Sequence, residues 1–160
     1  MTTPDLYDGV VFDDLDAAVA HVDSVGMEGW VRRAALAVEG VPVDRVYAGF
    51  SLGAGLAQIL AFGDEGAQGL VLMHGAIGPH GLDAAAWPTK LRAQLHYSER
   101  DPWVEAPDVE ELIAFAAPGA LETFAYPGEA HLFGFSAHAD YDPDLAERTW
   151  ERVRDFLATV

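Results

Sequence analysis

The order of apolar and polar residues along the chain predicts helices and strands in alternation. Two helices are expected near the N-terminus. The first begins at Asp13 and Asp14, where an acidic residue suits the N-cap, and ends at Gly26. The second runs from about Met27 to Glu39, carries apolar residues at helical spacing, and is followed by a glycine that ends it.

Four later segments, each short and largely apolar, are predicted to be β-strands. They are Arg45–Phe50, Gly69–His74, Leu91–Tyr97 and Leu121–Tyr126. The second is continuously apolar, which is typical of a strand buried on both faces of a parallel sheet. Helices are expected between or after the strands, over Leu52–Phe62, Val109–Ala117 and about Asp142–Ala158. This alternation predicts one α/β domain over residues 1–160, with a mostly parallel sheet flanked by helices.

The segment Gly49–Gly53 is the most informative part of the chain. Its sequence, G-x-S-x-G, stands between an expected strand and an expected helix, which is the context of a nucleophile elbow. Such a turn strains the backbone of Ser51 and holds its hydroxyl clear of the sheet. The residues two positions on either side are expected to need minimal side chains, because strand and helix come close there. The backbone N–H of Leu52, in the first turn of the helix, is expected to point at a developing oxyanion.

A serine nucleophile needs a base, and the base needs a group that orients it. After an elbow, the acid and then the histidine each follow a later strand. Asp101 follows the strand at 91–97, and His131 follows the strand at 121–126. Glu99 is a rival acid, but Asp101 precedes Pro102 and is better placed to be held rigidly. The plainer alternatives are that Asp101 only begins an Asp-Pro turn and that His131 is a surface histidine.

Several other residues near these loops are candidates for contact with a substrate. His74 ends a strand beside the elbow and could line a pocket, although a packed, hydrogen-bonded structural histidine is the more ordinary interpretation. Trp103 and Phe133 could line an apolar acyl pocket, or could simply pack the loops. His138 and Asp140 do not match a recognised metal-ligand spacing relative to His131. The prediction is therefore no metal and no cofactor.

Composition and charge narrow the classes of partner. The chain has 26 acidic and 9 basic residues, a net charge of −17, which should repel nucleic acid and anionic membranes. It contains no cysteine, so disulfides, thiolate metal sites and a cysteine nucleophile are excluded. No apolar run approaches the length of a membrane span, and no signal peptide is visible. A cytoplasmic protein with a small-molecule substrate fits these observations.

Four stretches spread along the chain carry a family resemblance. They are Pro4–Gly9, Tyr47–Gly53, His96–Pro102 and Tyr126–Phe133, and the stretch Tyr141–Trp150 is similar too. Together they resemble the dienelactone hydrolase family of α/β hydrolases over essentially all 160 residues. The resemblance implies Ser51 as nucleophile, Asp101 as orienting acid and His131 as base.

The chain departs from that family in three respects. The namesake enzymes have Cys at the elbow, whereas this chain has Ser51 and so resembles their broader esterase-like relatives. The arginine that helps to hold the substrate carboxylate has no counterpart in Phe133–Phe135, so a dienelactone substrate is not expected. The stretch Pro4–Gly9 normally ends a middle strand. The chain is therefore expected to lack the first strands and the second oxyanion donor, which would leave the strand at 45–50 close to an exposed sheet edge.

The sequence thus favours a serine hydrolase that cleaves a small ester or lactone through a Ser-His-Asp triad and an acyl-enzyme. An alternative from another class is a non-catalytic α/β-hydrolase-like module that dimerises or binds a partner through its exposed sheet edge. Acyl transfer to an acceptor other than water would use the same elbow. Both a monomer and a homodimer are compatible with the sequence.

Overall fold

The computed structural model describes residues 1–160 apart from the side chain of Leu15, and the chain falls into two compact units, Met1–Pro42 and Val43–Val160. The first unit contains α1 (Leu15–Ala37), which is interrupted at Gly26, where φ is 71° and ψ is 156°. The side chain of Asp14 caps the helix by accepting from the Ala17 N–H at 2.8 Å. The two expected helices are therefore two segments of α1 joined at a kink. The single domain over 1–160 stays a prediction.

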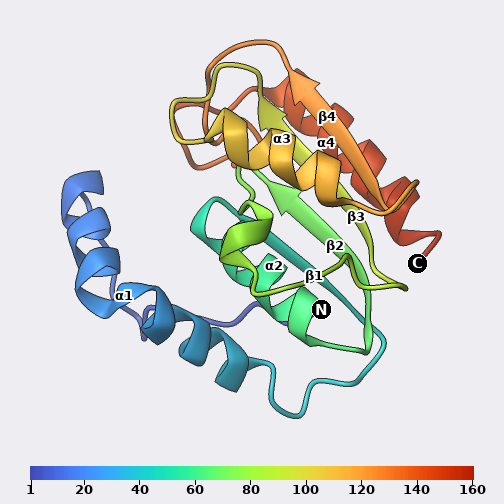
Figure 1. Ribbon diagram of the computed structural model, residues 1–160. Coiled ribbons are helices and arrows are strands. Elements are labelled where there is room, and N and C mark those ends of the chain that lie inside the picture. The colour runs from blue at the N-terminus through green and yellow to red at the C-terminus, as the bar shows by residue number, and fades with distance from the viewer. The chain divides into compact units, whose positions relative to one another are not determined.

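The second unit is a four-stranded parallel sheet with helices packed on it (Figure 1). Its strands are β1 (Arg45–Phe50), β2 (Ala67–Met73), β3 (Arg92–Ser98) and β4 (Leu121–Tyr126), in the spatial order β1-β2-β3-β4. Each neighbouring pair is parallel. The helical segments are α2 (Leu52–Gly63), the short 3₁₀ turn η1 (Pro79–Gly81), α3 (Ala106–Phe115) and α4 (Pro143–Leu157). The predicted α/β fold with a parallel sheet flanked by helices is confirmed.

The two faces of the sheet are covered by different helices. Val71 and Met73 of β2 form one buried cluster with Val153 and Phe156 of α4. The intervening residues of β2 face the other way, towards the side on which α2 contacts β1 and β2. In Figure 1, α3 and α4 lie on opposite sides of the sheet. Because both faces of β2 are covered, its side chains are apolar at successive positions rather than at alternate ones.

The element boundaries differ from expectation mainly at α3. The helix begins at Ala106, three residues before Val109, so that Pro107 lies within its first turn. Proline is tolerated there, since the first N–H groups of a helix have no intrahelical acceptor. The connection between β2 and β3 contains the η1 turn, which the sequence pattern does not announce. Within the described part of the chain, no helix has both the length and the apolar character that crossing a bilayer requires.

Candidate active site

Ser51 occupies a strained turn between β1 and α2. Its φ is 50° and its ψ is −119°, a backbone conformation that non-glycine residues rarely adopt. The conformation is held by hydrogen bonds on both sides of the residue. The Ser51 N–H donates to the Met73 carbonyl at 2.8 Å, and the Ser51 carbonyl accepts from the N–H groups of Ala54 and Gly55. The first turn of α2 and the end of β2 therefore fix this residue.

The two glycines of the elbow have different structural roles. A Cβ built on Gly49 would collide with the backbone carbonyl of Gly53, so only glycine fits at position 49. A Cβ on Gly53 would meet no atom within 4 Å. The expectation that both flanking positions need a minimal side chain is right for Gly49 and wrong for Gly53. The reason is directional, because the Gly53 position looks outward while that of Gly49 looks into the start of the helix.

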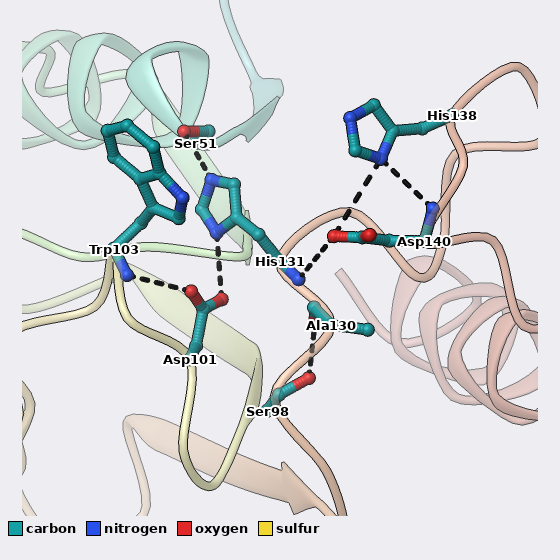
Figure 2. Close-up of polar contacts among 8 residues, drawn as sticks. All are labelled: Ser51, Ser98, Asp101, Trp103, Ala130, His131, His138 and Asp140. Carbon is teal, nitrogen blue, oxygen red and sulfur yellow. Dashed lines mark hydrogen bonds and ion pairs between the residues drawn. The ribbon is translucent and has the colours of Figure 1, made fainter.

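Ser51, His131 and Asp101 converge at the carboxyl ends of three parallel strands (Figure 2). His131 Nε2 lies 2.8 Å from Ser51 Oγ, and His131 Nδ1 lies 2.8 Å from Asp101 Oδ2. A carboxylate oxygen only accepts, so Nδ1 carries the proton and Nε2 is free to accept from the serine hydroxyl. The Asp101 carboxylate is fully covered, and the His131 side chain is 12% exposed. The arrangement can move a proton from the serine to a partly buried, charge-stabilised imidazole.

The acid loop distinguishes Asp101 from its rival. The second carboxylate oxygen of Asp101 accepts from the backbone N–H of Trp103 at 2.9 Å, so the side chain is bonded at both oxygens. Glu99 is exposed, and its backbone N–H donates to the Tyr126 carbonyl. Of the two candidate acids, the structure brings Asp101 to His131.

His74 lies behind His131 in an apolar setting. Its imidazole is buried, stacks on Phe50 at 5.5 Å and meets Phe133 edge to face at 4.4 Å. Neither ring nitrogen has a hydrogen-bond partner among the described residues, so the expected structural histidine is right in its packing and wrong in its hydrogen bonds. Burial, and secondly the neighbouring His131, lowers the pKa of His74 to about 4. At neutral pH the ring is therefore uncharged.

The predicted substrate contacts differ in accessibility. The Trp103 side chain is an exposed indole, with 57% of its surface free and its ring centroid 5.9 Å from that of His131. Phe133 and His74 are both covered, so contact between either of them and a substrate stays a prediction. Leu52 is the first residue of α2, where backbone N–H groups have no acceptor within the helix, and its role as oxyanion donor also stays a prediction.

Three polar residues contact these loops although no sequence pattern assigns them a role. Gln58, buried on α2, makes two hydrogen bonds to the backbone of Ile77 in the connection after β2. Ser98 and Asp140 bond to the backbone on either side of His131. No local pattern marks such side-chain-to-backbone bonds, because donor and acceptor are brought together only by the fold. Among the residues whose side chains are described, no three His, Asp or Glu groups gather as a metal site would need.

Comparison with known proteins gives a family and a fold. The family model of the dienelactone hydrolases matches residues 2–160. A carboxymethylenebutenolidase homologue of Saccharolobus solfataricus is 32% identical over 117 residues, which are 70% of this chain and 43% of that protein. The chain thus spans less than half the length of this curated relative.

Solved structures resemble the fold. A dienelactone hydrolase-like promiscuous phosphotriesterase from metagenomic libraries has a TM-score of 0.80 at 18% identity, over 97% of this chain and 72% of that one. A dienelactone hydrolase homologue from Klebsiella pneumoniae has a TM-score of 0.69 at 18% identity, over 93% of this chain and 69% of that one. At such identities the likeness concerns the fold.

Proposed function

The chain belongs to the dienelactone hydrolase family, and we propose that it is a serine hydrolase that cleaves a small ester or lactone through an acyl-enzyme. The observation that carries the proposal is the position of His131, whose two ring nitrogens lie 2.8 Å from Ser51 Oγ and 2.8 Å from an Asp101 carboxylate oxygen. Nucleophile, base and orienting acid in mutual hydrogen-bond contact form the minimal machinery of serine acyl transfer.

In the first half-reaction, Ser51 Oγ attacks the carbonyl carbon while its proton passes to His131 Nε2. Asp101 keeps the Nδ1–H tautomer and stabilises the imidazolium that forms. The carbonyl oxygen becomes an oxyanion, which the Leu52 N–H at the start of α2 receives. When the intermediate collapses, the bond to the leaving oxygen breaks and that oxygen takes the proton from His131. Ser51 is left as an acyl ester.

In the second half-reaction, water replaces the leaving alcohol. His131 Nε2 takes a proton from the water as the water oxygen attacks the acyl carbon, and the same proton then returns to Ser51 Oγ. The carboxylic acid leaves and the starting state is restored. Each proton that His131 accepts is given back within the same half-reaction, so no external acid or base is consumed.

The surroundings of His131 favour an uncharged substrate. Trp103 offers an exposed aromatic face beside the imidazole, and the rings behind it are Phe50, Phe133 and the uncharged His74. No Lys or Arg follows His131 within Leu132–Phe135. A net charge of −17 also disfavours the approach of anionic substrates. Neutral esters and lactones are therefore the proposed class, hydrolysed faster than analogues that carry a carboxylate.

The test is hydrolysis of p-nitrophenyl acetate by the wild type, Ser51→Ala and Ser24→Ala. Ser24 is an exposed serine whose hydroxyl bonds to the His21 carbonyl, and it serves as the matched control. We expect Ser51→Ala to lose at least about 10³-fold in kcat/KM and Ser24→Ala to keep the wild-type rate. Equal rates for the wild type and Ser51→Ala would reject the proposal.

A second measurement separates the hydrolase from a non-catalytic module that binds a partner through β1, an edge strand of the sheet. A fluorophosphonate probe should phosphonylate Ser51, as read by peptide mass spectrometry, and His131→Ala should abolish the adduct. A chain that is folded but unlabelled, and that elutes as a stable dimer, would favour the module.

A further inference from the structure

The peptide group that joins Ala130 to His131 is bonded by side chains at both of its polar atoms (Figure 2). The Ser98 hydroxyl donates to the Ala130 carbonyl at 2.7 Å. The His131 N–H donates to the Asp140 carboxylate at 3.0 Å. The two side chains come from opposite directions along the chain, one from the end of β3 and the other from the loop before α4. One planar peptide unit is thus fixed at its oxygen and at its nitrogen.

The Ser98 contact continues the pairing of β3 with β4 beyond the strands. Past the end of β3, the Glu99 N–H donates to the Tyr126 carbonyl at 2.8 Å and the Arg100 N–H donates to the Gly128 carbonyl at 3.0 Å. The acceptors Tyr126 and Gly128 are two residues apart, so the next carbonyl in the series is that of Ala130. The Asp101 N–H is not used for it, since it turns back to the Ser98 carbonyl at 3.2 Å. The buried Ser98 hydroxyl supplies the donor that the backbone does not.

The Asp140 contact is built from the other side of the loop. The Asp140 side chain is 39% exposed, and its own N–H donates to His138 Nδ1 at 3.2 Å. The loop is drawn back to its start by a bond from the Asp142 N–H to the Phe133 carbonyl at 3.1 Å. A hydrogen bond from a backbone N–H to a carboxylate is stronger than one between neutral groups. Asp140 therefore holds His131 by its backbone N–H, whereas Ser51 and Asp101 bond to the ring nitrogens of the same residue.

We infer that Ser98 and Asp140 are positioning residues, which hold the His131 backbone so that its imidazole bridges Ser51 and Asp101. The inference rests on the proposed function for its effect on rate. The imidazole must satisfy two contacts of 2.8 Å at once, so rotation about its backbone would break one or both. A displacement of about 1 Å at a reacting group can cost roughly 100-fold in rate. Neither Ser98 nor Asp140 touches the substrate carbonyl in this scheme.

The first experiment compares Asp140→Ala, Asp140→Asn and Asp142→Ala on p-nitrophenyl acetate. We expect Asp140→Ala to lower kcat about tenfold with KM unchanged, and Asp140→Asn to restore most of it, because the amide oxygen can still accept. Asp142 caps α4 through the N–H groups of Asp144 and Leu145, so its replacement costs stability without loosening the Ala130–His131 peptide. An equal loss of kcat in Asp142→Ala, or no rescue by asparagine, would overturn the inference.

The second experiment tests the other end of the peptide with Ser98→Ala and Thr149→Val. Thr149 is also buried and its hydroxyl also bonds to a backbone carbonyl, that of Leu145 on α4. We expect Ser98→Ala to lower kcat about tenfold and Thr149→Val to leave it unchanged. In the double variant Ser98→Ala/Asp140→Ala, the loss of kcat should exceed the product of the two single losses, because in each single variant the remaining hydrogen bond partly compensates for the missing one. Strictly multiplicative effects would mean that Ser98 and Asp140 act independently, which would contradict their joint hold on the Ala130–His131 peptide.

A third measurement does not depend on activity. In ¹⁵N-labelled protein, the His131 amide should exchange with solvent faster in Asp140→Ala than in the wild type, and Asp140→Asn should restore its protection. The ring should also lose its uniform Nδ1–H tautomer in Asp140→Ala. If these changes in exchange and tautomer appear in a chain without esterase activity, the proposed function fails and the positioning role of Asp140 stands. If the wild type is active but Asp140→Ala matches it in kcat, amide exchange and tautomer, the positioning role is overturned.

Discussion

The imidazoles of His74 and His131 lie edge to face with their ring centroids 6.1 Å apart, and they stand in opposite electrostatic situations. Both nitrogens of His131 are hydrogen-bonded, one of them to a carboxylate. Neither nitrogen of His74 has a partner among the described residues, and the ring is buried. An uncharged His74 is therefore the state compatible with a positive charge forming on its neighbour.

This relationship predicts how His74 titrates. Because burial, and then His131, lowers its pKa to about 4, the ring should stay neutral throughout the range from pH 7 to pH 5. Histidine ¹⁵N chemical shifts followed over that range should show no protonation of His74, with His74→Asn used to assign the signal. A midpoint near the ordinary value of about 6.5 would contradict the burial of this ring.

The two buried histidines also predict a loss of stability in acid. The pKa of His96 is lowered to about 3, first by burial and then by Arg152 and His74. An unfolded histidine binds a proton near pH 6.5, so between that value and the folded pKa the unfolded state holds more protons. Stability should therefore fall as pH falls from about 6.5 towards 4, with a slope of about 1.4 kcal/mol per pH unit for each histidine.

Urea unfolding at several pH values measures this slope. His96→Phe should reduce this slope by about 1.4 kcal/mol per pH unit between pH 6 and pH 4, which corresponds to one proton fewer bound on unfolding. Tyr126→Phe is the matched control, because it removes the hydroxyl bonded to His96 Nδ1 but keeps the buried imidazole, and it should leave the slope unchanged. A slope that responds equally to both variants would mean that the His96 imidazole is not the group that takes up this proton on unfolding.

The elbow glycines predict opposite effects of the same substitution. Gly49→Ala should cost at least about 3 kcal/mol, because its Cβ would collide with the backbone of Gly53, which cannot move without breaking the turn. Gly53→Ala meets open space within α2 and should stabilise the fold by up to about 1 kcal/mol. Chemical denaturation of the two variants makes the comparison. A destabilisation of similar size in both would mean that the turn needs glycine for another reason.

The acid assignment predicts a selective loss of rate. Asp101→Asn keeps the shape of the side chain but removes the charge that fixes the His131 tautomer, and kcat should fall roughly 10⁴-fold with little change in KM. Glu99→Gln alters the exposed rival and should have no effect on either constant. Steady-state ester hydrolysis distinguishes the two, and the reverse pattern would make Glu99 the orienting acid.

The sequence by itself determined the parts of this protein that depend on neighbouring residues. The bounds of β1 and β4 coincide with the predicted runs, since a short run rich in apolar and aromatic residues between turn residues is typical of a strand. The same holds for the break at Gly26 and for the elbow, where only glycine fits at position 49. Local sterics and periodicity are written in adjacent residues, so a sequence pattern reveals them.

The order of elements along the chain predicts Ser51, Asp101 and His131 as partners, but only the tertiary structure decided the geometry in which such distant groups meet. Ser51 and His131 are 80 residues apart, and their contact depends on the parallel register that carries the ends of β1, β3 and β4 to one edge of the sheet. The same register set the burial of His74 and the bonds that Ser98 and Asp140 make around His131. Such contacts arise from the packing of whole elements, which no single segment encodes, because each side chain finds its partner only after the strands have aligned.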